Sequence, residues 1–204
     1  PGLVTIDLDP LSSDEAAVLA RSVDDGIQGD RLASALSRCQ GNPLFIEELA
    51  RQPVAPMPVD PELLTRLRNE SAVPDALYEP LLSRLYTSGA DVGIAQAAAT
   101  IGRVFTRDVL GDVTSRGPEL VDRGLRSLLD GGLLDEEGDD VYSFRHALIR
   151  DVAYELQPRE QRATMHGRVG DALRARRKRG ADVSWGAIAT HFHAAGRLAA
   201  AIES

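Results

Sequence analysis

The chain has 204 residues, of which 43% are hydrophobic, and this is enough to bury one or two cores. Its 31 acidic residues outnumber 23 Lys and Arg, and the formal net charge of -8 disfavours free-standing binding to the phosphate backbone of nucleic acids. Cys39 is the single cysteine, which excludes an intrachain disulfide, and no apolar run approaches the roughly 20 residues of a membrane-spanning helix.

Residues 1–52 begin with a strand pattern and continue as helices. Apolar residues alternate over 4–8 and stop before Pro10, which predicts a short strand that ends in a turn. A single strand needs partners, so we expect this segment to be the end of a larger domain, which the family resemblance given below implies is an NTPase core. Ser12 and Glu15 have the spacing of a capping box and predict the start of a helix.

The next helix signal is a three-residue junction. A helix that begins near Leu32 is expected to end at Gly41, which can adopt positive φ. Asn42 is a good helix cap, and Pro43 suits the first position of a new helix, which we predict over 44–51. Residues 1–52 are therefore predicted to form a small helical region.

A proline-rich linker is predicted over 53–69. Four prolines between 53 and 61 disfavour a helix or a central strand and favour an extended connector, so this is the best domain boundary in the chain.

A winged-helix domain with a small β-hairpin is predicted over 70–155. Apolar residues recur at helical spacing in four segments, with a kink expected at Pro80: 75–85, 92–101, 107–113 and 119–129. Leu133 and Leu134, an acidic turn over 135–140 and the segment 141–144, which reads VYSF, then predict the hairpin. A further helix is expected from Arg145 to Glu155.

Residues 156–204 have the pattern of helices alone. A long helix is expected from Pro158 to about Arg177, followed by a helix over 185–195 and another from Leu198. The last two are predicted to form an antiparallel pair, the first unit of a tetratricopeptide-like helical array. The fold class is therefore predicted to be mainly α.

The residues that carry chemistry argue against a catalytic or metal site in this chain. No Gly-x-x-x-x-Gly-Lys-Ser/Thr occurs, so the chain has no phosphate-binding loop and is not expected to hydrolyse ATP by itself. Cys39 has no neighbouring histidine to activate it. His191 and His193 are two positions apart and would point to different sides of a helix, which favours structural roles over metal binding.

Charge also decides how the basic and winged-helix segments are interpreted. The basic run over 174–179 lies in the last turns of a predicted helix, where cations complement the helix dipole. Acidic residues outnumber basic ones on the predicted recognition helix over 119–130, and five more crowd the wing over 135–140. A free-standing winged-helix DNA-binding protein is the less favoured alternative, and the domain is expected to pack against protein.

Two segments carry a family resemblance. Residues 39–49, which read CQGNPLFIEEL, resemble the lid segment of STAND-class signal-transduction ATPases, among them bacterial proteins related to MalT and large LuxR-type regulators. Residues 144–154, which read FRHALIRDVAY, resemble the end of the winged helix in the same class, where related proteins have Met-His-Asp. Ala147 stands in place of that acidic residue. Residues 188–197 resemble the start of the helical array that follows.

The resemblance implies a nucleotide switch. Lid and winged helix would close over ATP or ADP bound by an upstream P-loop NTPase domain of the same parent protein. The implied nucleotide contacts are Gly41, Asn42, Pro43 and His146, with Pro43 near the adenine and His146 at the β-phosphate of ADP. Imidazole can donate a hydrogen bond to a phosphate oxygen, and the phosphate charge favours its protonated form.

The resemblance further implies a cytoplasmic, non-catalytic and regulatory portion of a bacterial protein. Downstream helical repeats are expected partners, and DNA is contacted only through a LuxR-type output domain elsewhere in the parent. No metal and no membrane partner are expected, and an oligomer formed on activation is left open. The alternative is the same module attached to a class III adenylate or guanylate cyclase, which the upstream sequence would distinguish.

Overall fold

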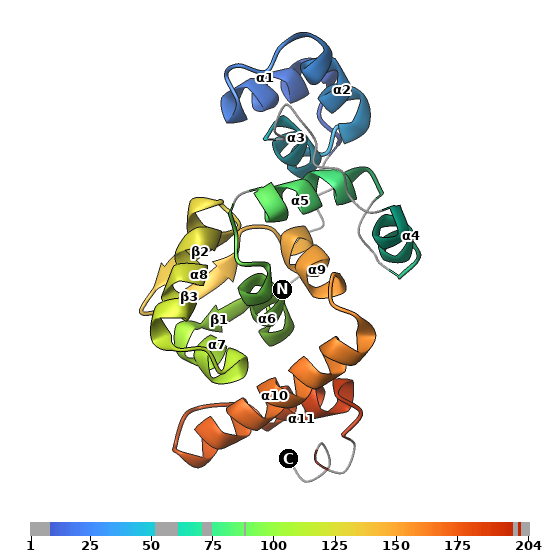
Figure 1. The fold of residues 1–204 in the computed structure, drawn as a ribbon. Helices are drawn as coiled ribbons and strands as arrows, with labels where there is room; N and C mark the ends of the chain where they lie inside the picture. Colours follow the sequence, from blue (N-terminus) through green and yellow to red (C-terminus); the bar gives the residue numbers. More distant parts are fainter. Residues whose placement is uncertain (1–8, 52–60, 71–74, 88, 198–199, 201–204) are drawn as a thin grey trace, which may run out of the picture. The chain divides into compact units, whose positions relative to one another are not determined.

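The computed structural model describes residues 9–51, 61–70, 75–87, 89–197 and 200. This part of the chain is mainly helical and contains one three-stranded antiparallel sheet, as predicted for the fold class (Figure 1). Two compact units are distinguished, one of residues 1–64 and 74–83 and the other of 65–73 and 84–204. No helix in the described ranges is both long enough and apolar enough to cross a membrane.

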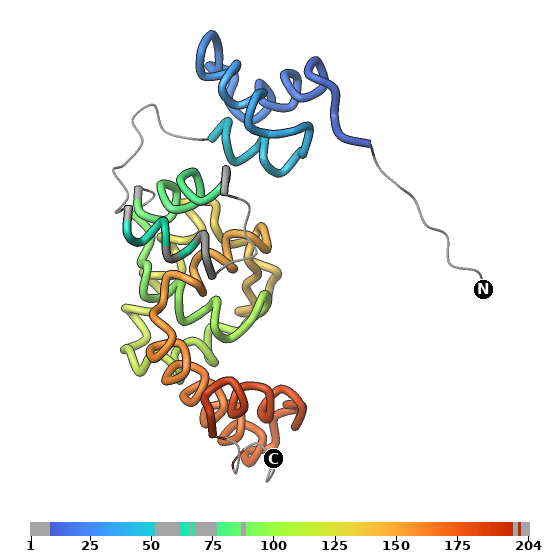
Figure 2. The backbone as a smooth tube through the Cα atoms, turned by 90° about the vertical axis from the view of Figure 1, so that its right-hand side faces the viewer, coloured from blue at the N-terminus to red at the C-terminus, as the bar shows by residue number. Residues whose placement is uncertain are grey.

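The first unit contains three short helices that pack on one another, α1 (Ser13–Val23), α2 (Gly29–Cys39) and α3 (Pro43–Ala50) (Figure 2). The predicted capping box is confirmed, because the Ser12 hydroxyl accepts from the amide of Glu15 while the Glu15 carboxylate accepts from the amide of Ser12. The core is built from small and branched side chains that are all buried: Ala16, Ala20, Ile27, Ala35, Cys39, Ile46, Leu49 and Ala50. Cys39 is thus a core residue.

The segment between the three helices and the sheet differs from the predicted linker. Helix α4 (Pro61–Glu70) occupies nearly all of the second half of the predicted 53–69 linker, so that prediction was too long. Pro61 is the first residue of α4, where a missing amide hydrogen costs no helical bond. Helix α5 (Asp75–Thr87) runs through Pro80. The strand predicted over 4–8 and residues 53–60 of the linker lie outside the described residues.

The second unit places helices before and around a small sheet. Helices α6 (Val92–Ile101), α7 (Arg107–Thr114) and α8 (Pro118–Asp130) are confirmed to within one residue. The sheet has the order β1-β3-β2, with all pairs antiparallel (Figure 1). Its strands are β1 (Val104–Thr106), β2 (Leu134–Gly138) and β3 (Val141–Phe144).

The predicted hairpin is confirmed, but its acidic turn was drawn too long. Residues 135–138 belong to β2, and the turn is formed by Asp139 and Asp140, whose φ values are 49° and 60°. Two successive residues at positive φ match the right-handed twist of a tight hairpin, and aspartate tolerates this conformation. Strand β1 was not predicted, since its three residues pair only with residues 141–143.

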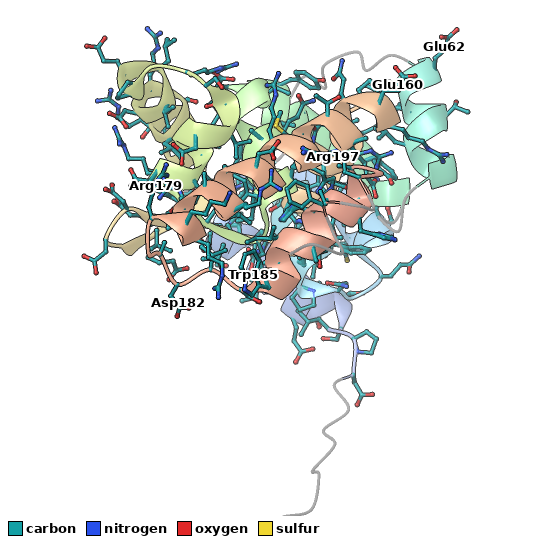
Figure 3. The ribbon with its side chains drawn as sticks, turned by 90° about the horizontal axis from the view of Figure 1, so that it is seen from below. Glu62, Glu160, Arg179, Asp182, Trp185 and Arg197 are labelled. Atoms are coloured by element: carbon teal, nitrogen blue, oxygen red, sulfur yellow. The ribbon has the colours of Figure 1, made fainter. Side chains whose placement is uncertain are left out.

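Three helices complete the second unit, α9 (Ala147–Glu155), α10 (Arg159–Lys178) and α11 (Trp185–Ala194). Helix α9 begins two residues later than predicted, because His146 is its extended N-cap. Helices α10 and α11 lie side by side (Figures 1 and 3). Gly170 allows their close approach, since a Cβ there would lie 2.7 Å from Phe192. Of the helix predicted from Leu198, only residue 200 is described.

Two helical glycines are expected to respond to alanine with opposite signs. A Cβ on buried Gly124 of α8 would lie 2.6 Å from Cγ1 of Ile94, so Gly124→Ala should destabilise the chain by about 1–3 kcal/mol. Gly111 of α7 faces open space, and Gly111→Ala should stabilise it by about 0.5–1 kcal/mol. Urea unfolding midpoints measure both, and shifts of the same sign would contradict this packing.

Candidate functional site

The junction between α2 and α3 adopts the geometry predicted for a helix stop and restart. Gly41 has a φ of 72°, and its carbonyl accepts from the amide of Leu11 at 2.8 Å. Asn42 caps α3, with its side-chain oxygen 3.0 Å from the amide of Leu44, and Pro43 occupies the first helical position. This cap prediction is confirmed.

Gly41 is required at this junction for a second reason. A Cβ there would lie 2.6 Å from the carbonyl oxygen of Leu11, so the chain that leads into α1 rests directly on the turn. Asn42 and Pro43 are exposed. The turn therefore has a fixed backbone and presents two side chains that a ligand can reach.

His146 lies at the other predicted contact position, between β3 and α9. It is half-buried, and its extended backbone serves as the N-cap of α9. Its carbonyl accepts from the amide of Ile149 at 3.1 Å, which starts the helix. The first turn of α9 contains no acidic side chain, so nothing there offsets the partial positive charge of the helix N-terminus.

Two arginines and one aspartate lie in the same region as His146. Arg145 binds Asp135 through two nitrogens, with Nε 3.0 Å and Nη2 2.5 Å from the same carboxylate oxygen. Arg84 donates to the carbonyls of Gly131 and Gly132. The hydrogen bond from Arg145 holds the pKa of Asp135 below its usual value, with smaller contributions from the charges of His146 and Arg84.

The predicted site residues fall into two groups. The structure brings Gly41, Asn42 and Pro43 together in one turn of the first unit, and it places His146 in the second unit. Sequence reasoning did not single out Arg84 or Arg145. The hairpin register held a signal for Arg145, since Asp135 of β2 pairs with Ser143 of β3, and Arg145 follows two residues after Ser143.

A hydrogen-bonded chain of three side chains was also missed. The Tyr154 hydroxyl of α9 lies 2.8 Å from Nε2 of His166 on α10, and Nδ1 of His166 lies 2.9 Å from Nδ1 of His191 on α11. His191 was predicted to be structural, but its partner was not found, because 25 residues separate the two rings. In the described ranges, no group of three His, Cys, Asp or Glu side chains is placed to hold a metal ion.

The pair of His166 and His191 should make the stability of the fold depend on pH in the mildly acidic range. Burial first, and then the nearby charge of His166, lowers the pKa of His191 to about 4, and burial followed by Arg150 and Arg162 lowers the pKa of His166. Both folded values lie below the unfolded value of about 6.5, so the stabilisation is complete above pH 6.5 and decreases as pH falls toward 4.

We therefore expect the free energy of unfolding to be about 1–2 kcal/mol smaller at pH 5 than at pH 7. The urea midpoint should be lower at pH 5 accordingly. The double variant His166→Gln/His191→Gln should show a flatter dependence between these values. Equal slopes in both proteins would contradict the assignment. The window lies above the range in which Asp135 and Asp122 become protonated, because the pKa values of both are lowered.

The basic run at the end of α10 is used within the fold. Arg176 pairs with Asp112 at 2.7 Å, Arg174 lies over the ring of Phe192, and Arg177 lies over the ring of Trp185. Figure 3 labels Trp185, the first residue of α11, and Arg197, which follows the end of α11 and also lies over the ring of Phe192. These contacts favour the structural interpretation of the run over phosphate binding.

No protein-family model matches this chain. A curated relative, "Uncharacterized protein R02095" of Rhizobium meliloti (strain 1021), is 31% identical over 177 residues, which cover 84% of this chain and 17% of the relative. The matched region thus spans about a sixth of the length of this relative.

Proposed function

We propose that this chain is the lid, winged-helix and first helical-repeat portion of a bacterial STAND-class signal-transduction ATPase. It closes over ATP or ADP held by a P-loop domain elsewhere in the parent protein and controls a LuxR-type transcriptional output. The observation that carries the proposal is the position of His146. It follows β3 of a β1-β3-β2 sheet and opens α9, where the resemblance requires a phosphate-contacting histidine.

The surroundings of His146 fit a phosphate group. Arg145 and Arg84 lie near it, and the first turn of α9 lacks an acidic residue. Helix N-termini and guanidinium groups are the usual protein partners of phosphate oxygens. ADP or ATP supplies negative charge when bound, and protonated His146 would donate a hydrogen bond to it.

The turn at Gly41–Pro43 fits the role of a lid contact. Its backbone is held by the hydrogen bond to Leu11, and the exposed ring of Pro43 offers a small apolar surface for an adenine base. The first unit would therefore bring one preformed edge to the nucleotide.

The remaining helices fit a role in transmission. Helices α10 and α11 pack on each other, and Gly170, Phe192 and the histidine pair specify how they pack. The antiparallel pair that we predicted, residues 185–195 with a helix from Leu198, lies only in part within the described residues. The match covers 17% of the relative, so that longer protein has room for a nucleotide-binding domain, further repeats and an output domain.

Photo-crosslinking of the intact parent protein with 8-azido-ADP tests the proposal. We expect label on the peptide that contains residues 41–51, because the reactive position of the base would face Pro43. Excess unlabelled ADP should abolish the label. Label confined to the P-loop domain, with none on this peptide under conditions that saturate the protein with ADP, would contradict the assignment of the first unit as a lid.

A further inference from the structure

We propose that Arg145 binds phosphate, and that Asp135 on the wing pairs with Arg145 in the absence of ligand. Asp135 therefore competes with the phosphate for this arginine. The site, which we call the cation cluster, consists of Arg84, Arg145 and His146. Its ligand is a diphosphate group. The inference deepens the proposed function, on which it rests for the identification of that diphosphate as part of a nucleotide.

The first observation is that two guanidinium groups converge on one point. A Cβ added to Gly132 would lie 3.0 Å from Nη2 of Arg84 and 3.1 Å from Nη1 of Arg145. Gly132 has a φ of 64° and carries no side chain to keep them apart. Two like charges so close to each other raise the local positive potential and favour a nearby anion.

The second observation is the anion that is already present. Asp135 accepts from Nε and Nη2 of Arg145, the two-pronged geometry with which arginine also binds phosphate. The charges of Arg145, His146 and Arg84 all lower the pKa of this one carboxylate. Asp135 thus occupies, within the chain, the place that an external anion would take.

The exposure of the Arg145–Asp135 ion pair indicates that a diphosphate can replace the carboxylate as the partner of Arg145. The side chains of Arg145 and Asp135 are 38% and 42% exposed, so their ion pair is open to water and contributes little net stability. A diphosphate offers more charge and more acceptor oxygens than one carboxylate. Arg145 can therefore leave Asp135 for the ligand at small cost, whereas two backbone carbonyls keep Arg84 in position.

The two arginines have different roles. Arg145 exchanges partners, and Arg84 is a positioning residue that supplies fixed positive charge. Asp135 weakens phosphate binding in the resting protein and releases Arg145 only when enough negative charge arrives. A ligand with a single phosphate group should compete poorly with this carboxylate, which gives the site a preference for diphosphates.

Calorimetric titration of the 204-residue chain with inorganic pyrophosphate tests the proposal. Asp135→Asn should tighten binding about 2- to 5-fold, because it removes the competing charge and keeps the side-chain shape. Arg145→Gln should weaken binding about 10-fold or more. The matched controls are Asp122→Asn and Arg107→Gln, which alter an Arg–Asp pair of similar exposure on α7 and α8 and should change nothing.

The outcomes separate this site from the proposed function. Unchanged affinity in Asp135→Asn, or equal losses in Arg145→Gln and Arg107→Gln, would overturn the proposal, provided that circular dichroism shows folded variants. ADP should bind the isolated chain no more tightly than pyrophosphate, since Pro43 is proposed to meet the adenine only when the P-loop domain of the parent protein holds the nucleotide. If no crosslink forms at residues 41–51 but the variants change pyrophosphate binding as expected, the nucleotide switch is refuted and the anion site is supported.

Discussion

His146→Ala in the intact parent protein is expected to shift the switch toward its open state. If imidazole contacts ADP only in the closed state, the substitution removes an interaction that the open state never had. A charge-assisted hydrogen bond contributes roughly 1.5–3 kcal/mol, so the ratio of closed to open protein should fall about 10- to 150-fold. ADP should dissociate faster, and output should rise without inducer.

Pro43→Ala is the matched comparison for this experiment. Loss of an adenine contact should weaken ATP and ADP alike, and a ligand contact that does not differ between states leaves the switch equilibrium less affected. Stopped-flow release of a fluorescent ADP analogue and basal output are measured for both variants. Unchanged release and unchanged output in His146→Ala would mean that the residue serves only as the cap of α9.

Phe192→Ala is expected to cause a large loss of stability in the second unit. Phe192 is fully buried, packs against Gly170 and lies beneath the guanidinium groups of Arg174 and Arg197. Truncation of a buried phenylalanine costs about 3–5 kcal/mol, since the ring leaves a cavity that its neighbours fill only in part. Urea unfolding followed by circular dichroism gives the difference directly.

Trp185→Ala on the same helix provides the control. Trp185 is 42% exposed and has one cation–π contact, with Arg177, so its removal should cost about 1 kcal/mol. A loss as large for Trp185 as for Phe192 would show that α11 is held at its first residue and not at its middle.

Local signals explain which parts of the fold could be predicted from sequence. The capping box at Ser12 and the turn at Gly41–Pro43 are decided by neighbours within three residues, and both were found. Strand β1 was missed because three residues show no alternation, and its formation depends on β3 about 37 positions later. The same reason hid the contact between His166 and His191.

The candidate site was predicted only in part, for a related reason. His146 and the Gly41–Pro43 turn were predicted from sequence motifs. The acidic residues of the wing, in contrast, were counted without regard to the basic side chains that pair with them. Asp135 was treated as one more acidic residue that repels DNA, although Arg145 binds it. Arg84 lies on a helix about 50 residues earlier and reaches the same corner by donating to the carbonyls of Gly131 and Gly132. The residue types in a sequence do not reveal a contact between a side chain and a distant backbone group.

Helix α9 connects the cation cluster of Arg84, Arg145 and His146 to the α10–α11 pair. It begins immediately after His146, and its nine residues, ALIRDVAYE, include no glycine or proline at which it would bend. Near its other end, about 12 Å along the axis, Tyr154 meets the ring of His166. A short helix of this kind moves as a rigid body, so a shift of His146 toward a ligand would displace Tyr154 by a similar distance. That displacement would act on the α10–α11 pair through the contact between Tyr154 and His166.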